Sequence, residues 1–146
     1  MSAMSDYLEN KLIDHIFRGV AYTAPAALYV GLLTAGPSDT GGGTEVSGNN
    51  YSRVNLAPST TNWAATNAAA STANPSAGTS GTTSNNSTIT FPTPSASWGT
   101  VTHFGLYDAS TSGNLLMWGA LTISKTINSG DTVTFPAASL SVQIDN

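Results

Sequence analysis

The sequence predicts a mainly β protein, an antiparallel β-sandwich or jelly-roll-like domain with one amphipathic helix at its N-terminus. Three observations support this fold class. After Pro25, apolar residues mostly alternate with polar ones, which is the period of a strand with one buried face. Gly, Pro, Asn and Ser separate short runs that are rich in Val, Ile, Thr and aromatic residues. Before Pro25, apolar residues recur at helical spacing instead.

The helix is expected from Asp6 to Arg18. Asp6 with Glu9 three residues later matches a capping box, and Gly19 is placed to end the helix. An apolar stripe follows one side of this segment and consists of Leu8, Leu12, Ile13, Ile16 and Phe17. Such a stripe covers one edge of the β-core or docks on a neighbouring subunit, and both roles are compatible.

Seven segments carry the strand pattern. They are residues 27–33, 52–56, 87–91, 99–107, 115–122, 132–135 and 139–144. Alternation is cleanest in the last two, which predicts one wet and one dry face there. Gly-containing turns at 108–114 and 128–130 are expected to close hairpins.

The chain divides on this pattern into an N-terminal helical arm, residues 1–20, and a single β-sandwich domain, residues 21–146. Residues 35–50, with three consecutive glycines, are expected to form a loop. A long polar insertion follows at about residues 58–86, and a structureless segment of that length is either functional or disordered. Trp63 suggests that the first part of this insertion packs against another part of the protein or a partner, as an additional short strand for example. The other interpretation is a loose surface insertion.

Charge is unusually scarce. Asp, Glu, Lys and Arg make up 8% of the chain, and none occurs between Val54 and Tyr107, whereas soluble domains average about 25%. Free monomers rely on charge to stay soluble and apart. The composition therefore indicates a subunit that is packed against partners for most of its existence.

Composition also limits the partners. The net charge is −4, and only four basic residues are spread along the chain, so no nucleic-acid partner is expected. No apolar run approaches the ~20 residues of a membrane-spanning helix, so no membrane partner is expected either. The chain has no cysteine, which excludes disulfides, thiol catalysis and thiolate metal sites.

No motif predicts an enzyme. Residues 41–44 lack the lysine of a phosphate-binding loop. His103, Asp108 and one of the many serines can be combined into a triad, but no nucleophile elbow or oxyanion motif supports it. The scattered carboxylates and two distant histidines form no metal-ligand cluster. We expect no catalytic residue, metal or cofactor.

The aromatic residues allow two interpretations. Trp63, Trp98, Trp118, Tyr51 and Tyr107 are of the type that fills a β-core or lies at an interface, which is the more common role. Exposed rings of the same type stack on sugars, as in β-sandwich lectins.

Two stretches of the sequence together resemble a known group of proteins. The first comprises YLENKLIDHIFR (7–18), AALYVGLLTAGP (26–37) and GTEVSGNNYSR (43–53). The second comprises ITFP (89–92), ASWGTVTHFGLYD (96–108), GNLLMWGAL (113–121) and SKTINSGDT (124–132). This combination resembles small virion proteins of tailed bacteriophages, including cyanophages and other marine phages. They are described as head decoration or cement proteins, or as tail-fibre-like proteins. The resemblance covers nearly the whole chain outside residues 58–86 and carries over no functional residues.

The resemblance and the composition together predict a virion structural protein. Our first expectation is a capsid decoration or cement protein that stabilises the head by bridging shell subunits. The alternative is a collar, tail or fibre component, acting as a connector or a host-glycan adhesion module. A carbohydrate-binding domain is a third hypothesis.

The expected partners are the protein itself, as a dimer or trimer, and the major capsid protein or another virion protein. The expected location is the virion, after synthesis in the bacterial host cytoplasm. Subunit and shell contacts are expected from the helix and from the loops at 35–50 and 58–86. The residues predicted to form the interface are Leu8, Leu12, Ile16, Phe17, Trp63, Tyr51 and Arg53.

Overall fold

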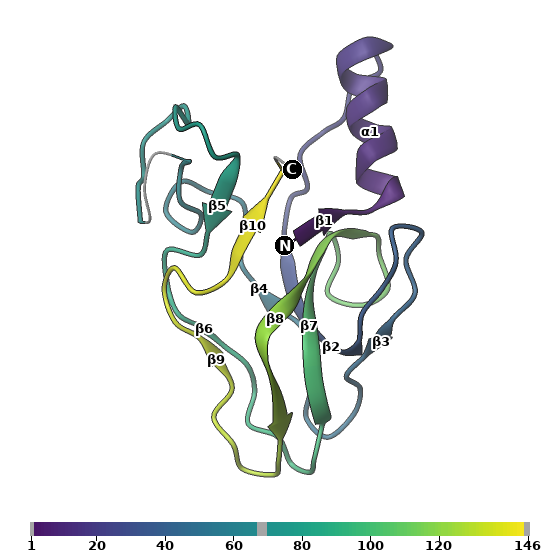
Figure 1. Ribbon diagram of the computed structural model, residues 1–146, viewed down its shortest axis with the longest axis vertical. Coiled ribbons are helices and arrows are strands. Elements are labelled where there is room, and N and C mark those ends of the chain that lie inside the picture. Colours follow the sequence, from purple (N-terminus) through teal and green to yellow (C-terminus); the bar gives the residue numbers. More distant parts are fainter. Residues whose placement is uncertain (1, 67–69, 145–146) are drawn as a thin grey trace.

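The computed structural model describes residues 2–66 and 70–144, and strands dominate it (Figure 1). Strands take 36% and helix 9% of these described residues, and every strand pair among them is antiparallel. Within these described residues, α1 (Asp6–Phe17) is the single helix and lies near the N-terminus. The predicted mainly β fold, with antiparallel sheets and one N-terminal helix, is confirmed.

The largest sheet contains six strands. In spatial order they are β1 (Ser2–Met4), β8 (Leu115–Ile127), β7 (Gly99–Tyr107), β2 (Tyr29–Ala35) and β3 (Thr44–Glu45), with β4 (Val54–Asn55) also paired to β2. β2 and β7 are the central strands, and their residues Val30, Leu32, Val101, Phe104 and Leu106 are buried. The sheet therefore supplies one side of the hydrophobic core.

Two short ribbons supply the other side of the core. β5 (Thr82–Ser84) pairs with β10 (Ser141–Gln143), and β6 (Ile89–Thr90) pairs with β9 (Thr134–Phe135). The Phe135 ring lies edge-on to Phe104 of the large sheet, with ring centroids 6.4 Å apart. The second layer of the predicted sandwich thus consists of two ribbons.

Asn85 connects the two ribbons from inside the core. Its side chain is fully buried, and its Oδ1 accepts from Leu140 N at 2.9 Å. Its Nδ2 donates to the carbonyl oxygens of Ser87 and Pro136, each at 2.8 Å. A buried amide with its hydrogen bonds made fixes the surrounding backbone, because leaving any of these groups unpaired is costly.

The strand boundaries differ from prediction in instructive ways. β7 occupies the predicted residues, whereas β8 runs on to Ile127, five residues beyond its predicted end at residue 122. The predicted strands at 52–56, 87–91, 132–135 and 139–144 shorten to two or three residues. The prediction of 35–50 as a pure loop is wrong, because β3 lies within it, and β1 was not predicted. Strands this short carry no readable alternation. β1, β3 and β4 form because a long neighbour offers an edge, whereas β5 with β10 and β6 with β9 form where two short segments meet.

The helix begins at Asp6 as predicted, but its N-cap was predicted one residue late. Ser5, not Asp6, is the N-cap, and its Oγ accepts from Leu8 N at 3.3 Å. Ser5 is held at the N-cap position because it is buried and its N–H donates to Leu116 O of β8 at 3.0 Å. At the other end Arg18 is the C-cap, and Gly19 follows it with φ +70°, a conformation that glycine adopts readily.

Both ends of the long polar insertion are docked on the domain. Trp63 Nε1 donates to Leu56 O at 3.1 Å, and Trp63 forms an isolated β-bridge with Asn85. Ala64 N donates to Ser84 O at 2.8 Å, so the start of the insertion lies beside β5 at its end. Residues 67–69 of the insertion lie outside the described part of the chain.

Candidate interaction site

Four of the six exposed large apolar residues in the described chain lie on α1 or directly after it. Ile13, Ile16, Phe17 and Val20 are 49%, 64%, 79% and 53% exposed. Ile13, Ile16 and Phe17, at i, i+3 and i+4, lie on one side of the helix, and Val20 follows directly after the helix, where its N–H donates to Asp14 O at 3.0 Å. We call these four residues the α1 apolar face. Figure 1 shows that the C-terminal end of α1 projects away from the sheets.

The other end of α1 is held firmly. Asp6 N donates to Asp39 O at 2.9 Å, which adds to the contacts that Ser5 makes with β8. Tyr7 and Leu8 are partly buried and pack against the core. The helix is therefore fixed in direction while its apolar face lies open to solvent. Burying one large apolar side chain stabilises a protein by about 1.5–3 kcal/mol, so an exposed cluster of this kind typically marks a contact with another molecule.

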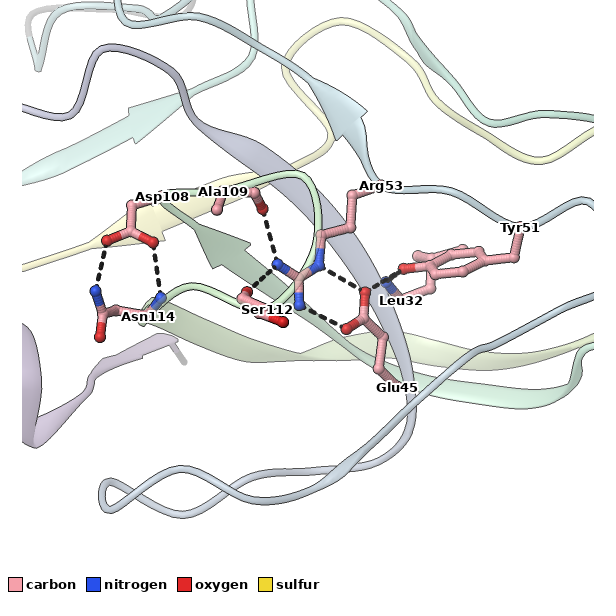
Figure 2. A network of polar contacts seen from close by, with 8 residues as sticks. All are labelled: Leu32, Glu45, Tyr51, Arg53, Asp108, Ala109, Ser112 and Asn114. Carbon is pink, nitrogen blue, oxygen red and sulfur yellow. Dashed lines mark hydrogen bonds and ion pairs between the residues drawn. The ribbon is translucent and has the colours of Figure 1, made fainter.

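A polar cluster stabilises the opposite edge of the large sheet. Arg53 donates to both carboxylate oxygens of Glu45, from Nε at 2.8 Å and from Nη2 at 2.7 Å. Tyr51 Oη donates to Glu45 Oε1 at 2.8 Å and accepts from Leu32 N at 2.9 Å. Figure 2 shows these groups converging on the Glu45 carboxylate. Charged two-pronged pairs of this geometry are the stronger kind of hydrogen bond.

The same arginine holds the hairpin turn between β7 and β8. Its Nη1 donates to the carbonyl oxygens of Ala109 and Ser112, each at 2.8 Å (Figure 2). The guanidinium lies 3.4 Å from the centroid of the Tyr107 ring, which is a cation–π contact. Arg53 thereby fixes the conformation of the exposed turn at 108–114.

Burial controls the ionisation of this cluster. Burial raises the pKa of Tyr51, and the negative charge of Glu45 raises it further, while the hydrogen bond from Leu32 N opposes the change. Burial also raises the pKa of Tyr107. Burial by itself lowers the pKa of Arg53, but the hydrogen bonds and charge of Glu45 more than compensate, so the net change is upward. The cluster keeps a phenol neutral beside an ion pair.

The predicted interface residues separate into two groups. Leu8 and Leu12 are half-buried on α1, whereas Ile16 and Phe17 belong to the exposed α1 apolar face. The remaining three, Tyr51, Arg53 and Trp63, direct their polar atoms to partners within the chain.

Two contributors were missed by sequence reasoning. Val20 lies beyond the predicted helix end, although it continues the spacing that starts at Ile13. Glu45 was not singled out, although it is the only acidic residue between Asp39 and Asp108. The available signal was that Glu45, isolated in sequence from other acidic residues, lies eight residues before Arg53, which indicates a possible ion pair.

Trp98 belongs to the core and Trp63 packs against it, whereas Trp118 lies on the opposite face of the large sheet. Trp98 is buried, and its Nε1 donates to Asn49 O at 3.0 Å. Trp63 and Trp118 are half-buried, and the Trp118 ring lies against His103 with centroids 5.9 Å apart. No tryptophan is exposed as a platform for sugar stacking.

In residues 2–66 and 70–144, no three His, Asp or Glu side chains gather into a possible metal site. No helix in the same residues has the length and apolar character needed to cross a membrane.

An antiparallel β-domain with few charges and an unsatisfied apolar helix face has the properties of a structural protein that works in an assembly. Comparison with protein families makes this specific. Residues 3–143 match the family described as podophage GP4 fiber I protein gp80, and the chain belongs to this family. It is thus a structural protein of the phage virion, of the fibre type, and the predicted resemblance to tailed-phage virion proteins is confirmed. A search among curated proteins gave no match.

Replacing Glu45 by Gln should destabilise the fold. The substitution leaves the Arg53 guanidinium, of which the side chain is only 7% exposed, without its counter-charge. We expect a loss of about 3 kcal/mol in the free energy of unfolding, because a buried pair is broken from one side. Urea denaturation measures this loss. The matched control is Asp14→Asn, which breaks the exposed Asp14–Arg18 pair and should cost at most about 0.5 kcal/mol. Equal losses in the two variants would contradict the structural role of the cluster.

Stability should fall at alkaline pH. Tyr51 and Tyr107 have pKa values raised above the ordinary 10.0, so the folded state keeps protons that the unfolded state releases. Their contribution to stability is therefore complete below about pH 10 and decreases as the pH rises above that value. Urea unfolding across this range, followed together with phenolate absorbance, checks the prediction. Full ionisation of all tyrosines near pH 10 in a protein that stays folded would disprove it.

Proposed function

We propose that this protein is a subunit of a phage fibre and that it associates with copies of itself, as a dimer or trimer, through the α1 apolar face. The proposal rests mainly on that face, because three large apolar side chains are exposed on a helix whose base is anchored to the sheet, and Val20 adds a fourth directly after the helix. The fibre family to which the chain belongs supports the same role.

The dimensions of the face suit a small symmetric bundle. Apolar residues at i, i+3 and i+4, as at Ile13, Ile16 and Phe17, form the kind of stripe by which helices pair side by side. The only ion pair of α1 among the described residues joins Asp14 to the C-cap Arg18 and leaves the apolar stripe free of charge. A stripe of little more than one helical turn gives weak pairing alone, and repeated contacts along an assembly would strengthen it.

Capsid decoration remains the second candidate, because the sequence resemblance also includes cement proteins. Hydroxyl and amide side chains, abundant between Val54 and Tyr107, make contacts to a shell without the cost of burying charge. In that arrangement the loops at 35–50 and 58–86 would contact the major capsid protein or another virion protein. An adhesion module based on exposed tryptophans receives no support, because Trp98 is buried and Trp63 and Trp118 are half-buried.

Labelling of virions distinguishes the two candidates. A fibre subunit should appear at a few discrete projections, with far fewer copies than the major shell protein. Gold-labelled antibody against the purified chain, with the copy number per particle from quantitative mass spectrometry, provides both measurements. A uniform coat at a simple ratio to the shell subunit would replace the fibre proposal by decoration, and absence from the particle would overturn both.

Self-association should depend on Phe17. Phe17→Lys removes the most exposed apolar side chain of the face and places a charge in the predicted contact. Losing the burial of one such side chain, worth about 1.5–3 kcal/mol, should weaken association roughly ten- to hundred-fold. Sedimentation velocity over a concentration series measures this change. Asn10→Lys, an exposed polar position on the same helix, adds the same charge and should leave association unchanged. If Phe17→Lys associates like the unchanged protein, the contact lies elsewhere.

A further inference from the structure

An open groove of about 970 Å³ separates β8 from the segment that contains β9. One wall is formed by β8 from Gly119 to Ile127, and the other by residues 131–136. The core residues Leu32, Val101 and Phe104 lie at its base. In Figure 1 the groove corresponds to the region between β8 and the β6–β9 ribbon.

Both walls of the groove are strand edges without a partner. On the outer edge of β8, β1 pairs only with Met117, Trp118 and Gly119. Beyond Gly119, no strand in the described chain takes that edge, and β9 pairs with no strand other than β6 there. Backbone N–H and C=O groups on such edges are ready to pair with an added strand.

The course of β8 exposes one large apolar residue beside this groove. Val101 pairs with Lys125 and His103 with Ala120, so four residues of β8 lie opposite Thr102 alone. This wide bulge carries Ile123, which lines the groove and is 80% exposed. Bulges commonly re-aim side chains next to functional sites. An isoleucine in this position gains from a covering partner.

We propose that the groove accepts an extended, uncharged strand from a second copy of the chain, which adds to the edges of β8 and β9. The lining contains one positive residue, Lys125, and one negative residue, Asp131, so the groove is neutral overall and favours an uncharged strand. This proposal rests on the proposed self-assembly of the chain and adds a second, separate contact to it.

The chain itself contains a segment with the required chemistry. Residues 21–27 are uncharged, lie outside helix and strand, and alternate Tyr22, Ala24 and Ala26 with Ala21, Thr23 and Pro25. The structure gives the backbone of residues 23–27 no hydrogen bond. Seven extended residues span about 23 Å, close to the roughly 26 Å of the unpaired part of β8. Pro25 removes one donor, which a strand tolerates at an edge.

Disulfide trapping tests this contact directly, because the chain has no cysteine of its own. Ala24→Cys combined with Ile123→Cys should form disulfide-linked multimers on mild oxidation of the full chain. The control combines Ala24→Cys with Ser110→Cys, which lies in the exposed turn at 108–114 and should not trap multimers. Equal cross-linking in the control, a disulfide within one chain only, or none at all would overturn the proposal.

A charge in the groove separates this contact from the α1 contact. Ile123→Lys should reduce assemblies larger than the α1 dimer or trimer roughly ten-fold while leaving that oligomer intact. Phe17→Lys should instead weaken the α1 oligomer itself. If Ile123→Lys assembles like the unchanged protein, the groove proposal fails and the α1 proposal stands. Circular dichroism melting checks that each variant is folded. Because the Ile123 side chain is 80% exposed, we expect Ile123→Lys to leave the fold intact.

Discussion

The ion pair between Glu45 and Arg53 ties together parts of the chain that would otherwise meet only at short strands. It links β3, the approach to β4, and the turn between β7 and β8, and through Tyr51 it reaches β2. Gly31 is required for this closeness, because a Cβ there would lie 2.9 Å from Glu45 Oε1. A buried pair contributes little net stability when complete, yet it strongly favours one arrangement of its neighbours over others.

Elsewhere in the molecule, amides and hydroxyls replace charge as the specifying groups. The Asn85 side chain joins the two ribbons from the core, and the Trp98 indole N–H donates to the backbone carbonyl oxygen of Asn49. Neutral groups of this kind satisfy buried backbone atoms with a smaller desolvation penalty than ions. The same chemistry suits a subunit whose surface is covered by neighbours, since neutral side chains can be buried in a contact without the desolvation cost of charged side chains.

Sequence reasoning was reliable where one element carries its own pattern. The alternation in β7 and the apolar stripe of α1 were readable because each spans several periods. It failed where pairing is imposed by a neighbour: β1 and β3 are two or three residues long, and β8 continues to Ile127 because β7 offers it hydrogen bonds at Thr100 and Gly99. The polar cluster was half predicted. Arg53 and Tyr51 were singled out for an interface, but their meeting with Glu45 depends on the register of β3 against β2, which composition does not encode.

The two ends of the described chain lie side by side, and this has a practical meaning. Ser2 Oγ donates to Gln143 O at 3.1 Å and accepts from Gln143 N at 2.7 Å. Because the two ends of the described chain are close together, a short linker can join them, and the fold is suited to circular permutation. Joining residues near the two ends with a short linker and reopening the chain within the exposed residues 72–80 would place the new chain ends in the long polar insertion. Foreign peptides grafted there would be carried on a phage particle without interrupting any strand of the six-stranded sheet.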